Sequence, residues 1–425
     1  MALTILIFLL LFTLIIGLPL PFCLGVASVG ALLFFDFPVP MTIVPQRFVA
    51  GIDSFSFMAI PFFLLVGDLM NTAGITQRII RLSNALVGHL PGGLAQVNVV
   101  SSMFFGGISG SSSADTASIG SILIPAMKKE GYDADFSVAL TATSSCCGPI
   151  IPPSIGLILY GVIANVSITK LFLAGYIPGL LLGGSLLITA YVISKERGYP
   201  THPRANAREL FEAFKGSIFA AALPFLIIGG LLSGVFTVTE AAGVAVVYTL
   251  FVGFFIYREL TISGTIQVLR NAVVKVGTLM SIAASALIFA WVLTILEVPQ
   301  QLALAILSFS DNKYIILLML NVFFLFIGMF MEPKASLLIL MPVILPLLQP
   351  LGIDLIHFGI IIIFNNVIGL ITPPIGIVLN LAAKLGNVGM DRASIAALPF
   401  LGSMLIVLVI ITYVPALVLF LPGLL

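Results

Sequence analysis

Long apolar segments, each at least the length of a membrane-spanning helix, follow one another along almost the whole chain. A helix needs about twenty predominantly apolar residues to cross the hydrocarbon core of a bilayer. Windows of that length predict spans at residues 2–35, 55–72, 136–165, 171–194, 217–236, 238–257, 270–297, 356–384 and 393–421. The first is long, and we expect one crossing that is broken at Pro19 and Pro21. The pattern predicts an all-α polytopic membrane protein.

Two further apolar segments, 94–126 and 313–348, are long enough to enter and leave a membrane on the same side, and each has a polar middle. The polar middle runs from Gly106 to Asp115 in the first segment and from Met331 to Lys334 in the second. We expect two re-entrant helical hairpins whose tips stop inside the membrane. Non-helical backbone at that depth must be covered by protein or water.

Composition supports the same class. Hydrophobic residues make up 60% of the 425 residues and charged residues 8%, against roughly 25% charged in an average soluble domain. In water such a chain would expose large apolar patches, so its solvent must be lipid. A net charge of +1 argues against nucleic-acid binding, which requires a clustered basic face.

The basic residues predict an orientation. With these spans, fourteen of the 18 basic residues fall on one face and three, Arg47, Lys170 and Lys313, on the other, while Lys334 lies at a hairpin tip. The positive-inside rule makes the first face cytoplasmic. We therefore expect a cytoplasmic N-terminus, a periplasmic C-terminus, a first hairpin that enters from the cytoplasm and a second that enters from outside.

One spacing links the two halves of the chain. Adding 221 takes Pro125 to Pro346, Gly131 to Gly352, Asp133 to Asp354, Gly148 to Gly369, and Pro152-Pro153 to Pro373-Pro374. Each copy consists of a hairpin, a short loop and a span interrupted by Pro-Pro. Five crossings separate the hairpins, and an odd number predicts inverted repeats. Inverted repeats with broken helices are typical of secondary transporters, whose binding site lies where the breaks meet near the midplane.

The candidate ion- and substrate-binding residues are therefore the residues of the two tips and the two breaks. In the first half they are Ser109, Gly110, Ser111, Ser112, Ser113, Asp115, Thr143, Ser144, Ser145, Gly148 and Pro152. In the second half they are Gly328, Met331, Glu332, Asn365, Asn366, Gly369, Thr372 and Pro373. Small polar residues also serve helix packing in membranes, and Lys334 could simply pair with Glu332, so these alternatives stay open.

The chemistry of these residues favours sodium. Hydroxyl, amide and backbone carbonyl oxygens bind a monovalent cation without trapping it, and a proline inside a helix frees a carbonyl one turn back. Half-helix N-termini can face an anionic substrate. We expect Na⁺ at Ser109, Ser144, Ser145, Gly148, Gly328, Asn365, Asn366, Gly369 and Thr372.

An acidic residue inside a membrane span costs free energy, so it is a functional candidate by default. Asp115 and Glu332 lie at the two tips, whereas Asp68, Glu240 and Glu297 lie nearer span ends, where snorkelling or helix capping accounts for them.

An enzymatic alternative rests on one short motif. Gly107-Ile108-Ser109-Gly110 matches the Gly-x-Ser-Gly of intramembrane serine proteases. Such a nucleophile needs a general base, and only His357, at the end of a span, could serve. The chain lacks the Gly-x-x-x-x-Gly-Lys-Ser/Thr loop needed for ATP hydrolysis. We therefore expect a transporter that is not an enzyme.

Several motifs together resemble the large permease subunit of tripartite ATP-independent periplasmic (TRAP) transporters, over essentially the whole chain. These motifs are Ala59-Ile60-Pro61-Phe62-Phe63, Gly88-His89-Leu90-Pro91-Gly92-Gly93, Ser109 to Asp115, Pro125-Ala126-Met127, Gly131-Tyr132, Gly148 to Ser154 and Thr372-Pro373-Pro374.

The resemblance implies a sodium-coupled elevator in the bacterial inner membrane. A transport domain, residues 91–200 and 311–425, would slide against scaffold helices in residues 1–90 and 201–310. The implied partners are a small four-helix membrane subunit and a periplasmic substrate-binding protein, and the implied substrates are carboxylates such as C4-dicarboxylates and sialic acids. A stand-alone sodium/anion symporter of related architecture and, more remotely, an intramembrane serine hydrolase are the alternatives.

Overall fold

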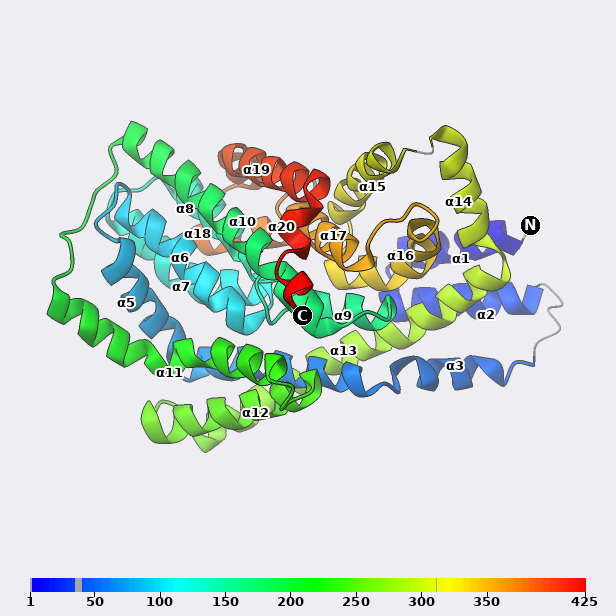
Figure 1. The fold of residues 1–425 in the computed structure, drawn as a ribbon, viewed down its shortest axis with the longest axis horizontal. Helices are drawn as coiled ribbons and strands as arrows, with labels where there is room; N and C mark the ends of the chain where they lie inside the picture. The colour runs from blue at the N-terminus through cyan, green and yellow to red at the C-terminus, as the bar shows by residue number, and fades with distance from the viewer. Residues whose placement is uncertain (1, 35–39, 311) are drawn as a thin grey trace.

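The computed structural model of the chain describes residues 2–34, 40–310 and 312–425. Residue 35, where the first expected span ends, and residue 311, where the second segment of the expected transport domain begins, lie outside the described residues. Within the described ranges the chain is helical and contains no β-strand. The prediction of an all-α chain is thus confirmed (Figure 1).

The helices of the first half begin near the N-terminus and end with the long helix α10. They are α1 (Ala2–Ile15), α2 (Leu20–Phe34), α3 (Ile43–Ile52), α4 (Ala59–Thr72), α5 (Ile75–Val87), α6 (Gly93–Ser109), α7 (Ser112–Lys129), α8 (Ala134–Ser144), α9 (Ile155–Ile163) and α10 (Ile168–Arg197). Short 3₁₀ helices precede α4 (Phe55–Met58) and follow α8 (Ser145–Cys147).

The helices of the second half repeat much of this order. They are α11 (Ala207–Leu232), α12 (Val238–Phe251), α13 (Ile262–Ile295), α14 (Val298–Phe309), α15 (Lys313–Gly328), α16 (Pro333–Leu348), α17 (Leu355–Gly369), α18 (Ile377–Gly386), α19 (Met390–Tyr413) and α20 (Pro415–Leu419). A π-helical turn (Val252–Ile256) extends α12, and a 3₁₀ helix (Pro422–Leu424) follows α20.

Six of the described helices are long and apolar enough to cross a membrane. They are Phe55–Thr72, Ile168–Arg197, Ala207–Leu232, Val238–Ile256, Ile262–Ile295 and Met390–Tyr413, and each overlaps a predicted span. The last is shorter than the predicted 393–421. Proline at 415 cannot continue the helical hydrogen bonding, and Val414 before it leaves the helical region (φ −121°, ψ 73°).

The expectation of one broken crossing over residues 2–35 is wrong. Helices α1 and α2 fold back on each other as a pair, with Gly17 at the turn in the left-handed region (φ +85°). Figure 1 shows the N-terminus and the C-terminal end of α2 at the same edge of the molecule. The cytoplasmic placement of the N-terminus assumed a single crossing here and loses its basis.

The two predicted hairpins and the two predicted breaks are all helix–turn–helix features. Helices α6 and α7 pack together with the turn at Gly110–Ser111, and α15 joins α16 through residues 329–332. Between α8 and α9, and between α17 and α18, the chain leaves the helical path, and the bonds Pro152–Pro153 and Pro373–Pro374 are both cis.

Helix bounds follow the spacing of 221 residues beyond the motifs themselves. The first residues of α7, α8 and α9 are Ser112, Ala134 and Ile155. Adding 221 gives 333, 355 and 376, and α16, α17 and α18 begin at Pro333, Leu355 and Ile377. The helix pair α1 and α2 likewise corresponds to the C-terminal part of α11 and to α12.

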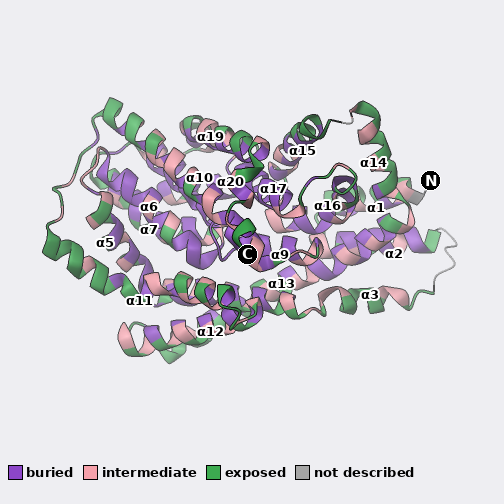
Figure 2. Ribbon diagram, in the orientation of Figure 1, coloured by how far each residue is buried: buried purple, intermediate pink, exposed green. Residues whose placement is uncertain are grey.

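Packing separates the helices into two groups. Helices α6, α7, α8 and α10 pack mainly with one another and with α17–α19, whereas α2–α4 pack mainly with α12 and α13. Helix α5 contacts both α6 and α11, and α14 contacts both α13 and α16. Buried residues are dense on α6 and α17 (Figure 2).

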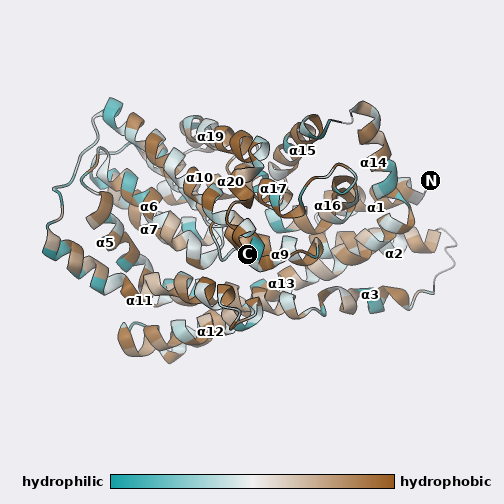
Figure 3. Ribbon diagram, viewed as in Figure 1, coloured by the Kyte–Doolittle hydropathy of each residue, from teal (hydrophilic) through white to brown (hydrophobic). Residues whose placement is uncertain are grey.

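Many outer residues are exposed and still apolar. Figure 3 shows hydrophobic residues along α11, α12, α14 and α19, and Phe225 and Phe309 are each 78% exposed. Apolar surface of this extent requires lipid around it.

Candidate functional site

The first hairpin tip lies directly against the first break. A Cβ atom on Gly106 would lie 2.9 Å from Cα of Gly148, and one on Gly110 would lie 2.6 Å from the carbonyl oxygen of Pro153. Gly110 also has a φ of +59°, which side-chain-bearing residues rarely adopt. The backbones of tip and break can therefore approach this closely only because these positions are glycine.

A network of buried polar side chains joins α6, α7 and α8 behind this tip. Ser102 Oγ donates to Asp115 Oδ1 (3.2 Å) and lies 3.1 Å from Ser144 Oγ. Ser144 Oγ in turn donates to Asn98 Oδ1 (3.0 Å), and Asn98 Nδ2 donates to Thr141 Oγ1 (2.7 Å). All five residues are buried. The network places the carboxylate of Asp115 among hydroxyl and amide groups.

The second tip and the second break meet in the same way. A Cβ atom on Gly328 would lie 3.2 Å from Cα of Gly369 and 3.5 Å from Cα of Asn366. Asn365 Nδ2 donates to Asn321 Oδ1 (2.7 Å), and Asn321 Nδ2 donates to Thr412 Oγ1 (3.1 Å). Each half thus joins an asparagine of one hairpin arm to the polar pair of its broken helix.

The two tips converge on common cavities. A cavity of about 60 Å³ is bounded by Ser111, Ser112 and Ser113 of the first tip and by Glu332 and Lys334 of the second. A larger cavity of about 530 Å³ lies between these tips and helices α4 and α13, and Ser109, Ser111, Ser113, Glu332 and Lys334 line it too. The helices therefore bring together tip residues that are more than two hundred positions apart.

Several unpaired polar atoms lie at the first hairpin and the second break. Among the described residues, buried side-chain atoms without a hydrogen-bond partner include Asp115 Oδ2, Asn365 Oδ1 and both side-chain polar atoms of Asn366. A buried polar atom without a partner costs about 1–3 kcal/mol, so such atoms call for an explanation. Neutral oxygens and one carboxylate oxygen are a donor set that fits a hard cation such as Na⁺.

Four of the predicted site residues occupy less central positions. The Thr143 hydroxyl donates to carbonyls of its own helix (Ala139 O, 2.9 Å; Leu140 O, 3.0 Å). Met331 lines neither of the cavities at the tips. Pro373 is exposed, and Pro152 lines a separate apolar cavity beside α11.

The structure shows the contacts of the charged residues and of the histidine that the sequence left open. Glu332 and Lys334 form the expected ion pair (2.8 Å), and Glu240 forms a capping box with Thr237. The account of Asp68 was wrong, because Asp68 pairs with Lys275 across α4 and α13 and lines the larger cavity. His357 Nε2 bonds Ile411 O (2.8 Å), so this ring nitrogen is engaged away from Ser109.

Sequence reasoning missed several residues of the polar network. Asn98, Ser101 and Ser102 of α6 are buried and stand at helical spacing in an otherwise apolar segment, so they share one face of the helix. That polar stripe is a signal visible in the sequence. Asn321, which lies alone in an apolar run, gave a weaker signal.

A helical membrane fold with broken helices and converging hairpin tips is typical of secondary transporters. Comparison with known proteins gives the family. The family described as "Tripartite ATP-independent periplasmic transporter, DctM component" matches residues 6–417. The chain belongs to this family, as the motifs of the sequence predicted.

Relatives cover nearly all of the chain. The sialic acid TRAP transporter large permease protein SiaM of Vibrio cholerae is 40% identical over 408 residues, covering 96% of this chain and 95% of that protein. The C4-dicarboxylate TRAP transporter large permease protein DctM of Pseudomonas aeruginosa is 41% identical over 371 residues, 87% of each. These relatives are transporter permease subunits, so the prediction that the chain is not an enzyme is confirmed.

A solved structure shares the fold. The chain superposes on the crystal structure of the Alcanivorax borkumensis YdaH transporter with a TM-score of 0.57, over 84% of this chain and 87% of that chain. The two sequences are 16% identical, so this likeness concerns the fold alone.

Proposed function

We propose that the chain carries out sodium-coupled uptake of a carboxylated organic solute across the bacterial inner membrane, as the large membrane subunit of a three-component transporter. The observation that carries the sodium part is the set of unpaired buried polar atoms at the second break, on Asn365 and Asn366. In the first half, Asp115 has an unpaired oxygen beside Ser102. One Na⁺ per half would be a partner for the unpaired oxygens of both groups.

A carboxylate is the substrate that the cavity between the tips suits best. Relatives are named for sialic acid and for C4-dicarboxylates, which are carboxylates. Helices α7 and α16 begin at the two tips, and their N-terminal ends carry a partial positive charge that attracts anions. Lys275 and Lys334 add two cationic side chains to the larger cavity, each paired with an acidic residue there, Asp68 and Glu332.

The family name supports the proposed partners. A tripartite periplasmic transporter with a large permease protein implies a small membrane subunit and a periplasmic binding protein. Co-purification of a small membrane protein with the chain would support this assembly. A chain that transports alone would favour the stand-alone symporter.

We propose that the edge holding the ends of α5, α7, α10 and α18 faces the cytoplasm. Loops there are tied together by His202 N to Gly88 O (3.1 Å) and by Lys128 Nζ to Gly386 O (3.0 Å). Most basic residues of the sequence belong to this edge, in agreement with the positive-inside rule. The N-terminus, at the opposite edge in Figure 1, then faces the periplasm.

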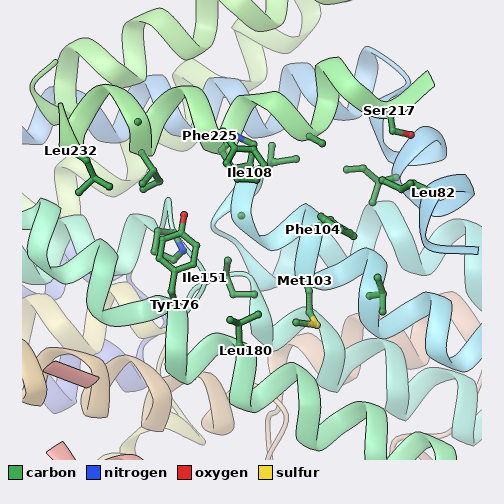
Figure 4. A pocket seen from close by; sticks show the side chains of 18 of the residues that line it. Leu82, Met103, Phe104, Ile108, Ile151, Tyr176, Leu180, Ser217, Phe225 and Leu232 are labelled. Carbon is green, nitrogen blue, oxygen red and sulfur yellow. The ribbon is translucent and has the colours of Figure 1, made fainter. Parts of the chain in front are cut away.

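We propose that the expected transport domain (91–200 and 311–425) slides against the scaffold (1–90 and 201–310). A cavity of about 690 Å³ supports this division, because it lies between α11 on one side and α6 and α10 on the other. Its lining is almost wholly apolar, with Phe104, Ile108 and Tyr176 facing Phe225 and Leu232 of α11 (Figure 4). Apolar side chains that meet across this cavity oppose sliding less than hydrogen bonds would.

The sodium proposal is tested by the thermal stability of the purified chain in sodium against potassium at constant ionic strength. A ligand at a hundred times its dissociation constant stabilises the folded state by about 2.7 kcal/mol. We expect a saturable rise in unfolding temperature with sodium only, weakened in Asn366→Ala and in Ser145→Ala. An equal rise with potassium, or none, would remove the basis for sodium coupling.

A further inference from the structure

The cavity of about 530 Å³ has one wall that belongs to neither hairpin. Helix α4 contributes Leu64, Gly67, Asp68 and Asn71, and helix α13 contributes Val274, Lys275, Thr278, Leu279 and Ile282. The opposite wall is formed by serines of the first tip and by Glu332 and Lys334 of the second. A solute in this cavity therefore touches the hairpin tips and α4 and α13 at once.

One ion pair dominates the wall formed by α4 and α13. Lys275 Nζ donates to both carboxylate oxygens of Asp68, at 2.7 Å and 2.8 Å. The Asp68 side chain is 17% exposed, whereas the Lys275 side chain is 53% exposed. Lys275 lies within a helix long and apolar enough to span a membrane. An ionisable residue there is a functional candidate by default, because its burial in lipid is expensive.

We propose that Lys275 binds the carboxylate of the transported solute from the α13 side of the cavity, with Asp68 as the counter-ion that Lys275 keeps when no solute is bound. This inference rests on the proposed function, since it assigns a substrate-binding residue to the same cavity. It adds a residue outside both hairpins and both breaks.

The donor count of the ammonium group supports this role. An ammonium has three N–H donors, and Asp68 accepts two of them, so one remains for an incoming carboxylate. The more exposed partner of the pair is the cation. The other charged groups that line the cavity are Glu332 and Lys334, which are paired with each other at 2.8 Å. With both pairs intact the lining of the cavity carries no net charge. When one partner of the Asp68–Lys275 pair is removed, the other sets the sign of that net charge.

A purely structural ion pair makes a different prediction from a substrate-binding lysine. If the pair only holds α4 against α13, removing either partner has the same effect on transport. If Lys275 attracts the anion, Lys275→Met and Asp68→Asn have opposite effects on the apparent KM for the anion. The first leaves an unpaired carboxylate in the cavity, and the second leaves an unpaired ammonium.

The first experiment measures the charge of the cavity without any substrate. Ala117 lines the cavity from α7 and is exposed, and the three native cysteines are buried. We would compare the rates at which an anionic and a cationic methanethiosulfonate reagent modify Ala117→Cys. The ratio of anionic to cationic rate should fall about fivefold with Lys275→Met and rise about fivefold with Asp68→Asn, as a unit charge at short range predicts. Lys275→Met with Asp68→Asn together should restore the original ratio.

A matched control reports on charge away from the cavity. Thr201→Cys, in the exposed loop after α10, should keep one rate ratio in all four backgrounds. If the ratio at Ala117→Cys shifts in the same direction in both single variants, or does not shift, the proposal is overturned.

The second experiment measures transport by the chain reconstituted with its small subunit and its binding protein. Uptake of succinate and of sialic acid is measured, and the apparent KM is taken for the accumulated anion. We expect Lys275→Met to raise KM about tenfold with a smaller change in kcat, and Asp68→Asn to lower KM. Equal losses of kcat in both variants would overturn the proposal. If the wild-type complex accumulates neither anion, the proposed substrate class fails, while the rate ratios at Ala117→Cys still decide whether Lys275 and Asp68 set the charge of the cavity.

Discussion

The Sγ atom of Cys146 lies 3.6 Å from the carbonyl oxygen of Val367, and these two residues are 221 positions apart in the chain. The same spacing separates the two Pro-Pro breaks. Residues related by a two-fold axis can contact each other only where the axis passes between them. We propose that this contact marks the axis of an inverted repeat, where the 3₁₀ turn after α8 (Ser145–Cys147) meets α17.

Close backbone approach at the first break predicts a sharp cost for one methyl group. A Cβ atom on Gly106 would lie 2.9 Å from Cα of Gly148, whereas one on Gly184 in α10 would meet nothing within 4 Å. Gly106→Ala should lower stability by about 1–3 kcal/mol through overpacking. Gly184→Ala should be neutral or stabilising by up to about 1 kcal/mol, because alanine loses less backbone entropy in a helix. Thermal unfolding of both variants in the same detergent measures the difference, and equal unfolding temperatures would contradict it.

The pairing of α1 with α2 predicts the side on which the N-terminus lies. If these helices form a hairpin, Leu3 and Thr42 lie on one side of the membrane and Thr201 on the other. Leu3→Cys and Thr42→Cys should react with an impermeant thiol reagent added to intact spheroplasts. Thr201→Cys should react only after the membrane is opened. If Leu3→Cys, like Thr201→Cys, reacts only after the membrane is opened, then α1 and α2 form the single crossing that the sequence predicted.

Much of this fold could be predicted from hydropathy, and the error at α1 and α2 has a physical origin. Two short apolar helices joined by a tight turn have the same hydropathy as one long kinked span. What distinguishes the two cases is the turn itself, at Gly17 followed by Pro19. The repeat also held the answer, since residues 2–34 plus 221 fall on α11 and α12, which the sequence already divided into two spans.

The candidate site was predictable in part for the same kind of reason. Tip and break residues lie in local motifs of Gly, Ser, Asn and Pro, which a single sequence displays. The Asp68–Lys275 pair joins residues 207 positions apart, and no local pattern brings them together. Asp68 near a span end has an ordinary interfacial explanation until α13 is placed beside α4.

A surface cluster at the edge proposed to be cytoplasmic predicts a pH dependence. The Tyr199 hydroxyl donates to Asp133 Oδ2 (2.6 Å), and Arg197 Nη1 donates to the same oxygen (2.7 Å). These two contacts, the tyrosine first, lower the pKa of Asp133. The stabilisation that follows is complete above the unfolded pKa of about 3.9 and is lost as pH falls through the lower folded value.

Tyr199→Phe tests this dependence while keeping the ring, whose centroid lies 4.5 Å from that of Tyr132. The variant should unfold at a lower temperature than the wild type at pH 7, and the gap should shrink towards pH 3. Tyr191→Phe, at an exposed tyrosine of α10, is the matched control and should show no gap at any pH. A gap for Tyr199→Phe that stays constant from pH 7 to pH 3 would show that the Asp133 contact does not carry it.

The buried carboxylate of Asp115 predicts two effects of opposite sign. Asp115 Oδ1 accepts from Ser102 (3.2 Å), and Oδ2 has no partner among the described residues. Without a cation, a buried charge with one hydrogen bond destabilises the folded state. Asp115→Asn should therefore stabilise the chain by about 1–3 kcal/mol in potassium buffer. In sodium the same variant should show a smaller sodium-dependent rise than the wild type, because the ion proposed for the first half would lose its carboxylate ligand. Thermal unfolding in each salt measures both effects, with Ser102→Ala as the control that removes the hydrogen bond and keeps the charge. If Asp115→Asn destabilises the chain equally in both salts, Asp115 serves only the packing of α7 against α6.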